Sequence, residues 1–89
     1  DTLLGGAGND IIYGGGGDDY GHGGAGNDQV WGESGDDKLV GGSGADVIEG
    51  GSGNDDAFGQ DGNDLINAGS GNDYVEGGTD ADAPGDTIN

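Results

Sequence analysis

The 89-residue chain contains no cysteine, no methionine, a single proline and only one lysine or arginine, Lys38. Without cysteine it has neither disulfide bonds nor thiolate metal ligands. Without a basic surface it cannot neutralise nucleic-acid phosphates, and an anionic membrane surface would repel it. Long apolar runs are also missing, so we expect no membrane insertion by this segment and no signal or transit peptide.

Glycine and acidic residues dominate the composition instead. The chain has 26 glycines, 19 acidic residues, a net charge of −18 and 28% hydrophobic residues. Such a composition is typical of disordered chains, because little apolar surface opposes strong self-repulsion. Any stable fold is therefore expected to depend on something that cancels negative charge.

Aspartate recurs every nine residues from Asp1 to Asp73. Each aspartate from Asp10 onwards ends a glycine-rich hexad such as GGAGND, and a mostly aliphatic residue follows two positions later. Glycine permits the positive φ angles of turns, and three residues with one apolar centre suit a short strand. Glycine is too frequent for a helix. The sequence therefore predicts an all-β fold in which turns alternate with three-residue strands.

Two turns return the chain to its starting side, which predicts coils of 18 residues stacked in parallel at the usual interstrand spacing. About five such coils would form two parallel sheets, each strand giving one inward residue. The two inward rows are predicted to be Leu3, Gly21, Leu39, Ala57 and Val75, and Ile12, Val30, Ile48, Ile66 and Ile88.

The repeats are regular over residues 1–76, and the final unit, residues 77–89, is irregular. Its aspartate position is either Asp82 or, after a four-residue insertion, Asp86. We favour Asp86, because Asp86-Thr87-Ile88 restores the local spacing. The chain is expected to be one β-roll segment of a longer protein, because both ends would leave unpaired strand edges.

The same coil stacks the repeat aspartates. Carboxylates about 5 Å apart repel by about 0.8 kcal/mol in water and about 3 kcal/mol at an effective dielectric constant of about 20. The metal-free coil is therefore predicted not to form, whereas a divalent cation between stacked carboxylates would turn repulsion into attraction. Oxygen ligands on flexible glycine loops suit calcium better than magnesium. The two columns are predicted to be Asp1, Asp19, Asp37, Asp55 and Asp73, and Asp10, Asp28, Asp46, Asp64 and Asp86 or Asp82.

These hexads and strands resemble the nonapeptide G-G-x-G-x-D-x-U-x of the RTX, or hemolysin-type calcium-binding, repeat family. The resemblance implies a right-handed parallel β-roll with calcium ions between the turns of repeats n and n+2. It also implies type I secretion from Gram-negative bacteria and folding in extracellular calcium. About seven ions would bring the net charge from −18 to about −4. The family's carbonyl ligands, at the first and third turn positions, correspond to Gly5 and Ala7, Gly14 and Gly16, Gly23 and Ala25, Gly32 and Ser34, Gly41 and Ser43, Gly50 and Ser52, Gly59 and Asp61, and Ala68 and Ser70.

The chain departs from the family's pattern at a few positions. Glu33 and Gln60 replace the second glycine of their turns, Ala68 replaces the first, and Gly21 supplies no inward side chain. We expect these departures to alter the local turn shape more than the binding of ions.

The predicted function is that of a secreted, non-catalytic calcium-binding module. The alternative is a module that binds polysaccharide or a surface layer through Tyr13 and Trp31, which lie one coil apart on an outward face. His22 has no cysteine or second histidine beside it, and no catalytic motif occurs. The additional acids Asp18, Asp36, Asp56 and Asp61 are interpreted as solvated charges, with a supporting role around the ions as the alternative.

Overall fold

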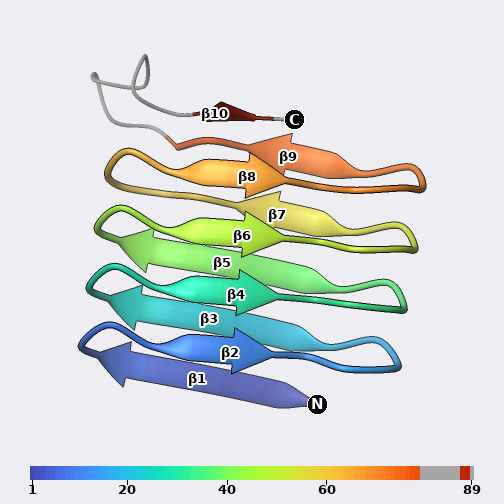
Figure 1. Ribbon diagram of the computed structural model, residues 1–89, viewed down its shortest axis with the longest axis horizontal. Helices are drawn as coiled ribbons and strands as arrows, with labels where there is room; N and C mark the ends of the chain where they lie inside the picture. The colour runs from blue at the N-terminus through green and yellow to red at the C-terminus, as the bar shows by residue number, and fades with distance from the viewer. Residues whose placement is uncertain (79–86, 89) are drawn as a thin grey trace.

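The computed structural model describes residues 1–78 and 87–88, and within them it contains only strands and turns (Figure 1). Strands alternate between two five-stranded sheets in which every pairing is parallel. The first sheet consists of β1 (Thr2–Ala7), β3 (Tyr20–Ala25), β5 (Lys38–Ser43), β7 (Asp56–Phe58) and β9 (Tyr74–Glu76). The second consists of β2 (Ile11–Tyr13), β4 (Gln29–Trp31), β6 (Val47–Glu49), β8 (Leu65–Asn67) and β10 (Thr87–Ile88).

Each strand pairs with the strand one coil further along the chain. Leu3 pairs with Gly21 in the first sheet, and Ile12 pairs with Val30 in the second, so one coil spans 18 residues. This register confirms the predicted parallel β-solenoid. The described residues include no helix of the length and apolarity that a membrane span requires.

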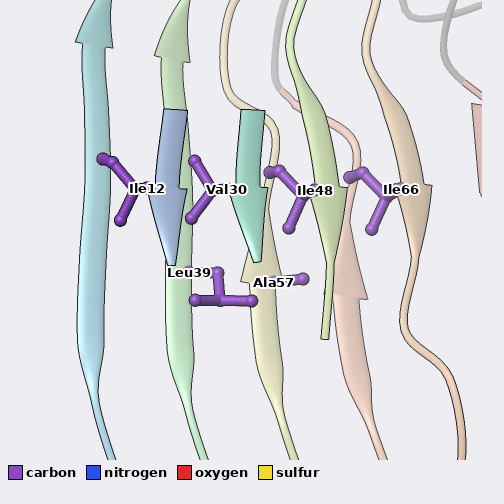
Figure 2. Packing of buried hydrophobic residues seen from close by; sticks show 6 residues of the cluster. All are labelled: Ile12, Val30, Leu39, Ile48, Ala57 and Ile66. Carbon is purple, nitrogen blue, oxygen red and sulfur yellow. The ribbon is translucent and has the colours of Figure 1, made fainter. Parts of the chain in front are cut away.

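The core is the thin layer between the two sheets. The pairing confirms the register of both predicted rows. Figure 2 shows the inward side chains of Ile12, Val30, Ile48 and Ile66 in line, with Leu39 and Ala57 opposite them. Val30, Ile48 and Ile66 are fully buried. So few apolar side chains give little hydrophobic stabilisation, because that stabilisation scales with the area removed from water.

Gly21 fills its place in the first inward row without a side chain. A Cβ at this residue would lie 3.1 Å from Cγ1 of Val30 and 3.6 Å from Cγ2 of Ile12, which both belong to the facing row. The branched side chains of the facing row therefore occupy the space that a larger residue would need. This packing accounts for the glycine in the inward row that runs from Leu3 to Val75.

Three strands are longer than the three residues predicted from the sequence. β1, β3 and β5 continue into the turns that follow, where Gly6 pairs with Gly24 and Gly24 with Gly42. Backbones approach closely there, because a Cβ at Gly24 would overlap the carbonyl of Gly6. β7 ends at Phe58, in the repeat where Gln60 replaces the corresponding glycine.

The last strand supports the insertion in the final unit. Ile88 pairs with Ile66, as the favoured alignment requires. Asp82 and Asp86, the two candidates for the aspartate of this unit, lie outside the described residues.

Candidate metal centre

The turns form the two edges of the solenoid, which lie at the left and right of Figure 1. The first edge carries the turns 5–10, 23–28, 41–46 and 59–64, and the second edge carries 14–19, 32–37, 50–55 and 68–73. In each turn the second and fourth residues have positive φ, as at Gly6 (89°) and Gly8 (102°). Glu33 and Gln60 keep this left-handed backbone, with φ of 73° and 69°, so the expected change of turn shape does not extend to this angle.

The aspartate that closes each turn is turned inward. Asp28, Asp46 and Asp55 are 1%, 1% and 0% exposed, which is unusual for a charged side chain. One carboxylate oxygen, Oδ1, accepts a hydrogen bond from the backbone N–H of the aspartate one coil earlier. Such bonds, 2.8–2.9 Å long, join Asp10 to Asp28, Asp19 to Asp37, Asp28 to Asp46, Asp37 to Asp55, Asp46 to Asp64 and Asp55 to Asp73.

This hydrogen bond refines the sequence-based expectation of bare carboxylates stacked on one another. A backbone N–H lies between successive side chains of a column, so half of each carboxylate is already satisfied by the protein. The other oxygen, Oδ2, is not. It is buried without a hydrogen-bond partner in Asp10, Asp19, Asp28, Asp37, Asp46 and Asp55.

In most turns, Oδ2 of the closing aspartate lies beside the first residue of its own turn and a carbonyl oxygen of the next coil. A Cβ placed on Gly23 would lie 2.6 Å from Oδ2 of Asp28 and 2.7 Å from the carbonyl oxygen of Gly41. On the other edge, a Cβ on Gly32 would lie 2.6 Å from Oδ2 of Asp37 and 2.7 Å from the carbonyl oxygen of Gly50. A Cβ would overlap both oxygens, so both lie close to the glycine Cα on the side where a side chain would begin. We call this pair of oxygens the oxygen cradle.

The oxygen cradle explains the first glycine of each turn. The first glycines, unlike Gly6 and Gly8, do not have positive φ, so backbone conformation does not require glycine there. Glycine is required because Oδ2 of the aspartate leaves no room for a Cβ. In the described part of the chain, seven first-turn glycines have the aspartate five residues later at this position: Gly5, Gly14, Gly23, Gly32, Gly41, Gly50 and Gly59.

In most oxygen cradles a backbone carbonyl completes the pair of oxygens. The facing carbonyls belong to Gly23, Gly32, Gly41, Gly50, Ala68 and Gly77, and at Gly41 the three nearest atoms all belong to Asp46. No backbone hydrogen bond ends on the carbonyl oxygens of Gly32 or Gly50 in the residues that the structure describes. Two oxygens left without a donor in a buried space create a strong local demand for positive charge.

The donor set fits a hard cation. Within residues 1–78 and 87–88, no three carboxylate, imidazole or thiolate side chains lie close enough to hold an ion by themselves. Any ion here would therefore take backbone carbonyls together with one carboxylate per turn. Carboxylate and carbonyl oxygens on a glycine-rich loop are the ligands that calcium accepts in flexible geometry.

Burial also changes the acidity of these carboxyl groups. It raises the pKa of Asp46 and of Asp55 from 3.8 to about 6, although their backbone hydrogen bonds act in the opposite direction. The pKa of Asp37 is raised for the same main reason. A nearby cation would stabilise the charged form of these carboxyl groups, which burial disfavours.

A second set of side chains bridges the coils, and the sequence analysis missed it. In most turns, Oδ1 of the residue before the closing aspartate accepts a hydrogen bond from the backbone N–H of the residue one coil later. We call this the outer ladder; its bonds are 2.8–2.9 Å long and run from Asn27 to Asn9, Ala45 to Asn27, Asp36 to Asp18, Asn54 to Asp36 and Asn72 to Asn54. The recurrence of Asn or Asp at this position was the available signal.

The outer ladder gives Asp18 and Asp36 a definite role. Their Oδ1 atoms accept the backbone N–H groups of Asp36 and Asn54. They are exposed but not simply solvated, because each one ties two coils together. Asp56 and Asp61 are exposed, in keeping with the interpretation as surface charges.

The remaining predicted ligands lie in less closed positions. The side chain of Asp1 is 86% exposed, although its amino terminus lies 2.6 Å from Oδ1 of Asp19. Asp73 is only half-buried. Among the third-turn carbonyls, that of Ser43 accepts the N–H of Gly26 at 3.2 Å and keeps a second lone pair.

The aromatic pair on the outer face is confirmed. The Tyr13 and Trp31 rings are stacked with centroids 6.0 Å apart and an angle of 30° between planes. The indole Nε1 of Trp31 is buried and makes no hydrogen bond. The two rings therefore contact each other, and the indole N–H is not presented to a sugar hydroxyl.

The comparison with known families agrees with this geometry. The family model of the RTX calcium-binding nonapeptide repeat matches the chain four times, at residues 1–30, 19–48, 31–66 and 49–83. No curated protein and no solved structure matches the chain. The fold is that of a repeat solenoid and not of a catalytic domain. With its nine-residue turns, buried aspartates and four overlapping matches, the chain belongs to the RTX calcium-binding nonapeptide repeat family.

Proposed function

We propose that this chain is a calcium-triggered folding module that takes about seven ions, one in each oxygen cradle. In each cradle the Oδ2 of the closing aspartate and the carbonyl of the first turn residue one coil later are ligands. Further carbonyls, including those of the third turn residues, complete the coordination. The ions convert self-repulsion into bridges between coils.

The observation that carries this proposal is the row of buried Oδ2 atoms without a hydrogen-bond partner. Burying an ionised carboxylate without a partner is costly, and one such group recurs in successive turns. Hydrogen bonds within the protein satisfy Oδ1 and leave Oδ2 facing another oxygen. A divalent cation would remove this penalty at Asp10, Asp19, Asp28, Asp37, Asp46 and Asp55.

Membership of the family further supports a role outside the cell. Extracellular modules bind calcium with dissociation constants of roughly 10⁻⁴–10⁻³ M, far above the free calcium concentration inside cells. The chain would therefore stay unfolded during export, as type I secretion requires, and fold on arrival. Its contribution to the parent protein would be structural.

Two neighbouring aspartates provide a matched test of the cradle. Asp55 is buried with its Oδ2 in an oxygen cradle, and Asp56 is exposed on the outer face of β7. Asp55→Asn and Asp56→Asn remove the same charge one residue apart. Equilibrium dialysis against calcium, followed by metal analysis, should show one ion fewer per chain for Asp55→Asn and an unchanged number for Asp56→Asn. Equal ion numbers in both variants would contradict the proposal.

A further inference from the structure

We infer that the charge of Asp36 raises the calcium affinity of the two oxygen cradles beside it, those of Asp37 and Asp55. These cradles on the second edge therefore bind their ions at a lower calcium concentration than the matching cradles of Asp28 and Asp46 on the first edge. This inference rests on the proposed function and adds to it the order in which the ions bind.

The outer ladder offers a matched pair of residues, Asp36 on the second edge and Asn27 on the first. Each is exposed and directly precedes a buried closing aspartate. Each backbone N–H donates a 2.8 Å hydrogen bond to the ladder residue one coil earlier. Each Oδ1 accepts the N–H of the residue one coil later, at 2.8 Å for Asp36 and 2.9 Å for Asn27. The two residues thus make the same links between coils and differ in charge.

The side chain of Asp36 extends from its own turn to the next turn of the same edge. Its Oδ1 accepts the N–H of Asn54, the residue directly before Asp55. A Cβ on Gly53 would lie 3.1 Å from this oxygen, and a Cβ on Gly44 would lie 2.9 Å from Oδ1 of Asn27. The two ladder oxygens therefore occupy equivalent places, and only Asp36 brings a negative charge there.

The charge of Asp36 acts on both neighbouring closing aspartates. Burial is the main cause of the raised pKa of Asp37 and Asp55, and the charge of Asp36 raises the pKa of both further. On the first edge, burial is again the main cause of the raised pKa of Asp46, and His22 acts in the opposite direction. A negative charge that disfavours an ionised carboxylate attracts a cation bound to that carboxylate. Asp36 therefore strengthens the binding of ions at both of its neighbours.

Lys38, the single lysine of the chain, follows this turn but does not pair with its acids. Its Nζ lies over the rings of Tyr20 and Phe58, 5.7 Å and 5.8 Å from their centroids. Between residues 1 and 78 it forms no ion pair. The negative charge of Asp36 therefore remains available to a cation at the second edge.

Crystals of the full chain grown in calcium can measure the order of binding. On transfer to solutions of falling free calcium, the anomalous signal at each site gives its occupancy, while the lattice holds the coils together. We expect the sites at Asp37 and Asp55 to lose half of their calcium at a concentration roughly three- to tenfold lower than the sites at Asp28 and Asp46. This is the effect of one exposed charge about 5–10 Å from a divalent ion at low salt.

A double variant separates the charge of Asp36 from its hydrogen bonds. Asp36→Asn removes the charge and keeps an oxygen for the N–H of Asn54, and Asn27→Asp places the charge at the matched position of the first edge. The two substitutions together leave the net charge at −18. In the double variant the order should reverse, with the first-edge sites at Asp28 and Asp46 keeping their calcium longest. In about 1 M salt the difference between the edges should shrink in both proteins, which the loss of a hydrogen bond would not cause.

The outcomes separate the inference from the proposed function. If the sites at Asp37 and Asp55 empty no later than those at Asp28 and Asp46, the inference is overturned and the proposed function stands. An unchanged order in the double variant also overturns it, because another difference between the edges would then set the order. Absence of calcium beside Asp37 and Asp55 in saturating calcium contradicts the proposed function itself.

Discussion

The backbone N–H of Asp37 donates a 2.8 Å hydrogen bond to Oδ1 of Asp55, one coil further along the chain. The same carboxylate has its Oδ2 buried with no partner. One side chain therefore has two separable roles: Oδ1 links adjacent coils, and Oδ2 is the proposed ligand of a cation. The variants described below separate the role of Oδ1 from that of Oδ2.

Replacing Asp55 by alanine or asparagine should give different losses. Asp55→Asn keeps an acceptor for the N–H of Asp37 and removes the anionic oxygen, whereas Asp55→Ala removes both. We expect Asp55→Ala to be less stable than Asp55→Asn in saturating calcium by about 0.5–1.5 kcal/mol, the net value of one hydrogen bond. Urea unfolding followed by circular dichroism measures the difference. Equal stabilities would mean that the Oδ1 bond contributes nothing.

Within residues 1–78, the outer ladder is interrupted at Ala45. The N–H of Ala45 bonds to Asn27, but alanine has no oxygen to offer to Asn63 in the next coil. Ala45→Asn should supply that bond and raise the free energy of unfolding in calcium by about 0.5–1.5 kcal/mol. Asn27→Ala is the matched control, because it removes the acceptor of the hydrogen bond from the N–H of Ala45. It should lower the free energy of unfolding by a similar amount. Destabilisation by Ala45→Asn would count against the ladder.

The positive φ of Glu33 is a strained position for a residue with a Cβ. The left-handed conformation costs a non-glycine residue about 1–2 kcal/mol. Glycine avoids this cost but loses more backbone conformational entropy on folding. Glu33→Gly should therefore stabilise the folded chain by up to about 1 kcal/mol. Gly15→Ala, one coil earlier on the same edge, is the control. Its added Cβ would meet no atom within 4 Å, so its loss of stability reports the φ angle alone. Thermal unfolding in calcium checks both variants, and a less stable Glu33→Gly would be the contrary result.

Acid should favour the metal-free fold. The pKa of Asp46 and of Asp55 lies at about 6 in the folded chain, above the usual 3.8, mainly because both are buried. The folded state therefore binds more protons than the unfolded state between about pH 4 and pH 6, so its stability rises as pH falls through this range. In excess chelator, the β-sheet signal in circular dichroism should increase on acidification from pH 7 to about pH 4. With calcium present the trend should reverse, because protons compete with the ions. A chelated chain that loses structure on acidification would refute this linkage.

The sequence predicts the fold well because the repeat carries the same information many times. The nine-residue spacing places Leu3, Ile12 and their equivalents in the inward rows, and even the irregular final unit aligns through the pairing of Ile88 with Ile66. The exact length of β1, β3 and β5 could not be predicted, because it depends on how closely neighbouring glycine backbones approach.

The candidate site is only partly predictable. The spacing identifies the aspartates, but it does not divide their work between Oδ1 and Oδ2, since that depends on which atom faces the backbone of the adjacent coil. The role of Asn9 and its equivalents was visible as a recurrence, but its meaning required the direction of the hydrogen bonds.

The most direct measurement of the central claim is circular dichroism of the full chain during a calcium titration that begins in excess chelator at neutral pH, with magnesium as the control. The account predicts a spectrum without β structure at the start and a cooperative rise of the β-sheet signal at roughly 10⁻⁴–10⁻³ M calcium. Magnesium should produce little change, because it demands stricter octahedral coordination and releases its water reluctantly. A folded spectrum in chelator at neutral pH would contradict the claim that buried, unpartnered carboxylate oxygens make this fold depend on calcium.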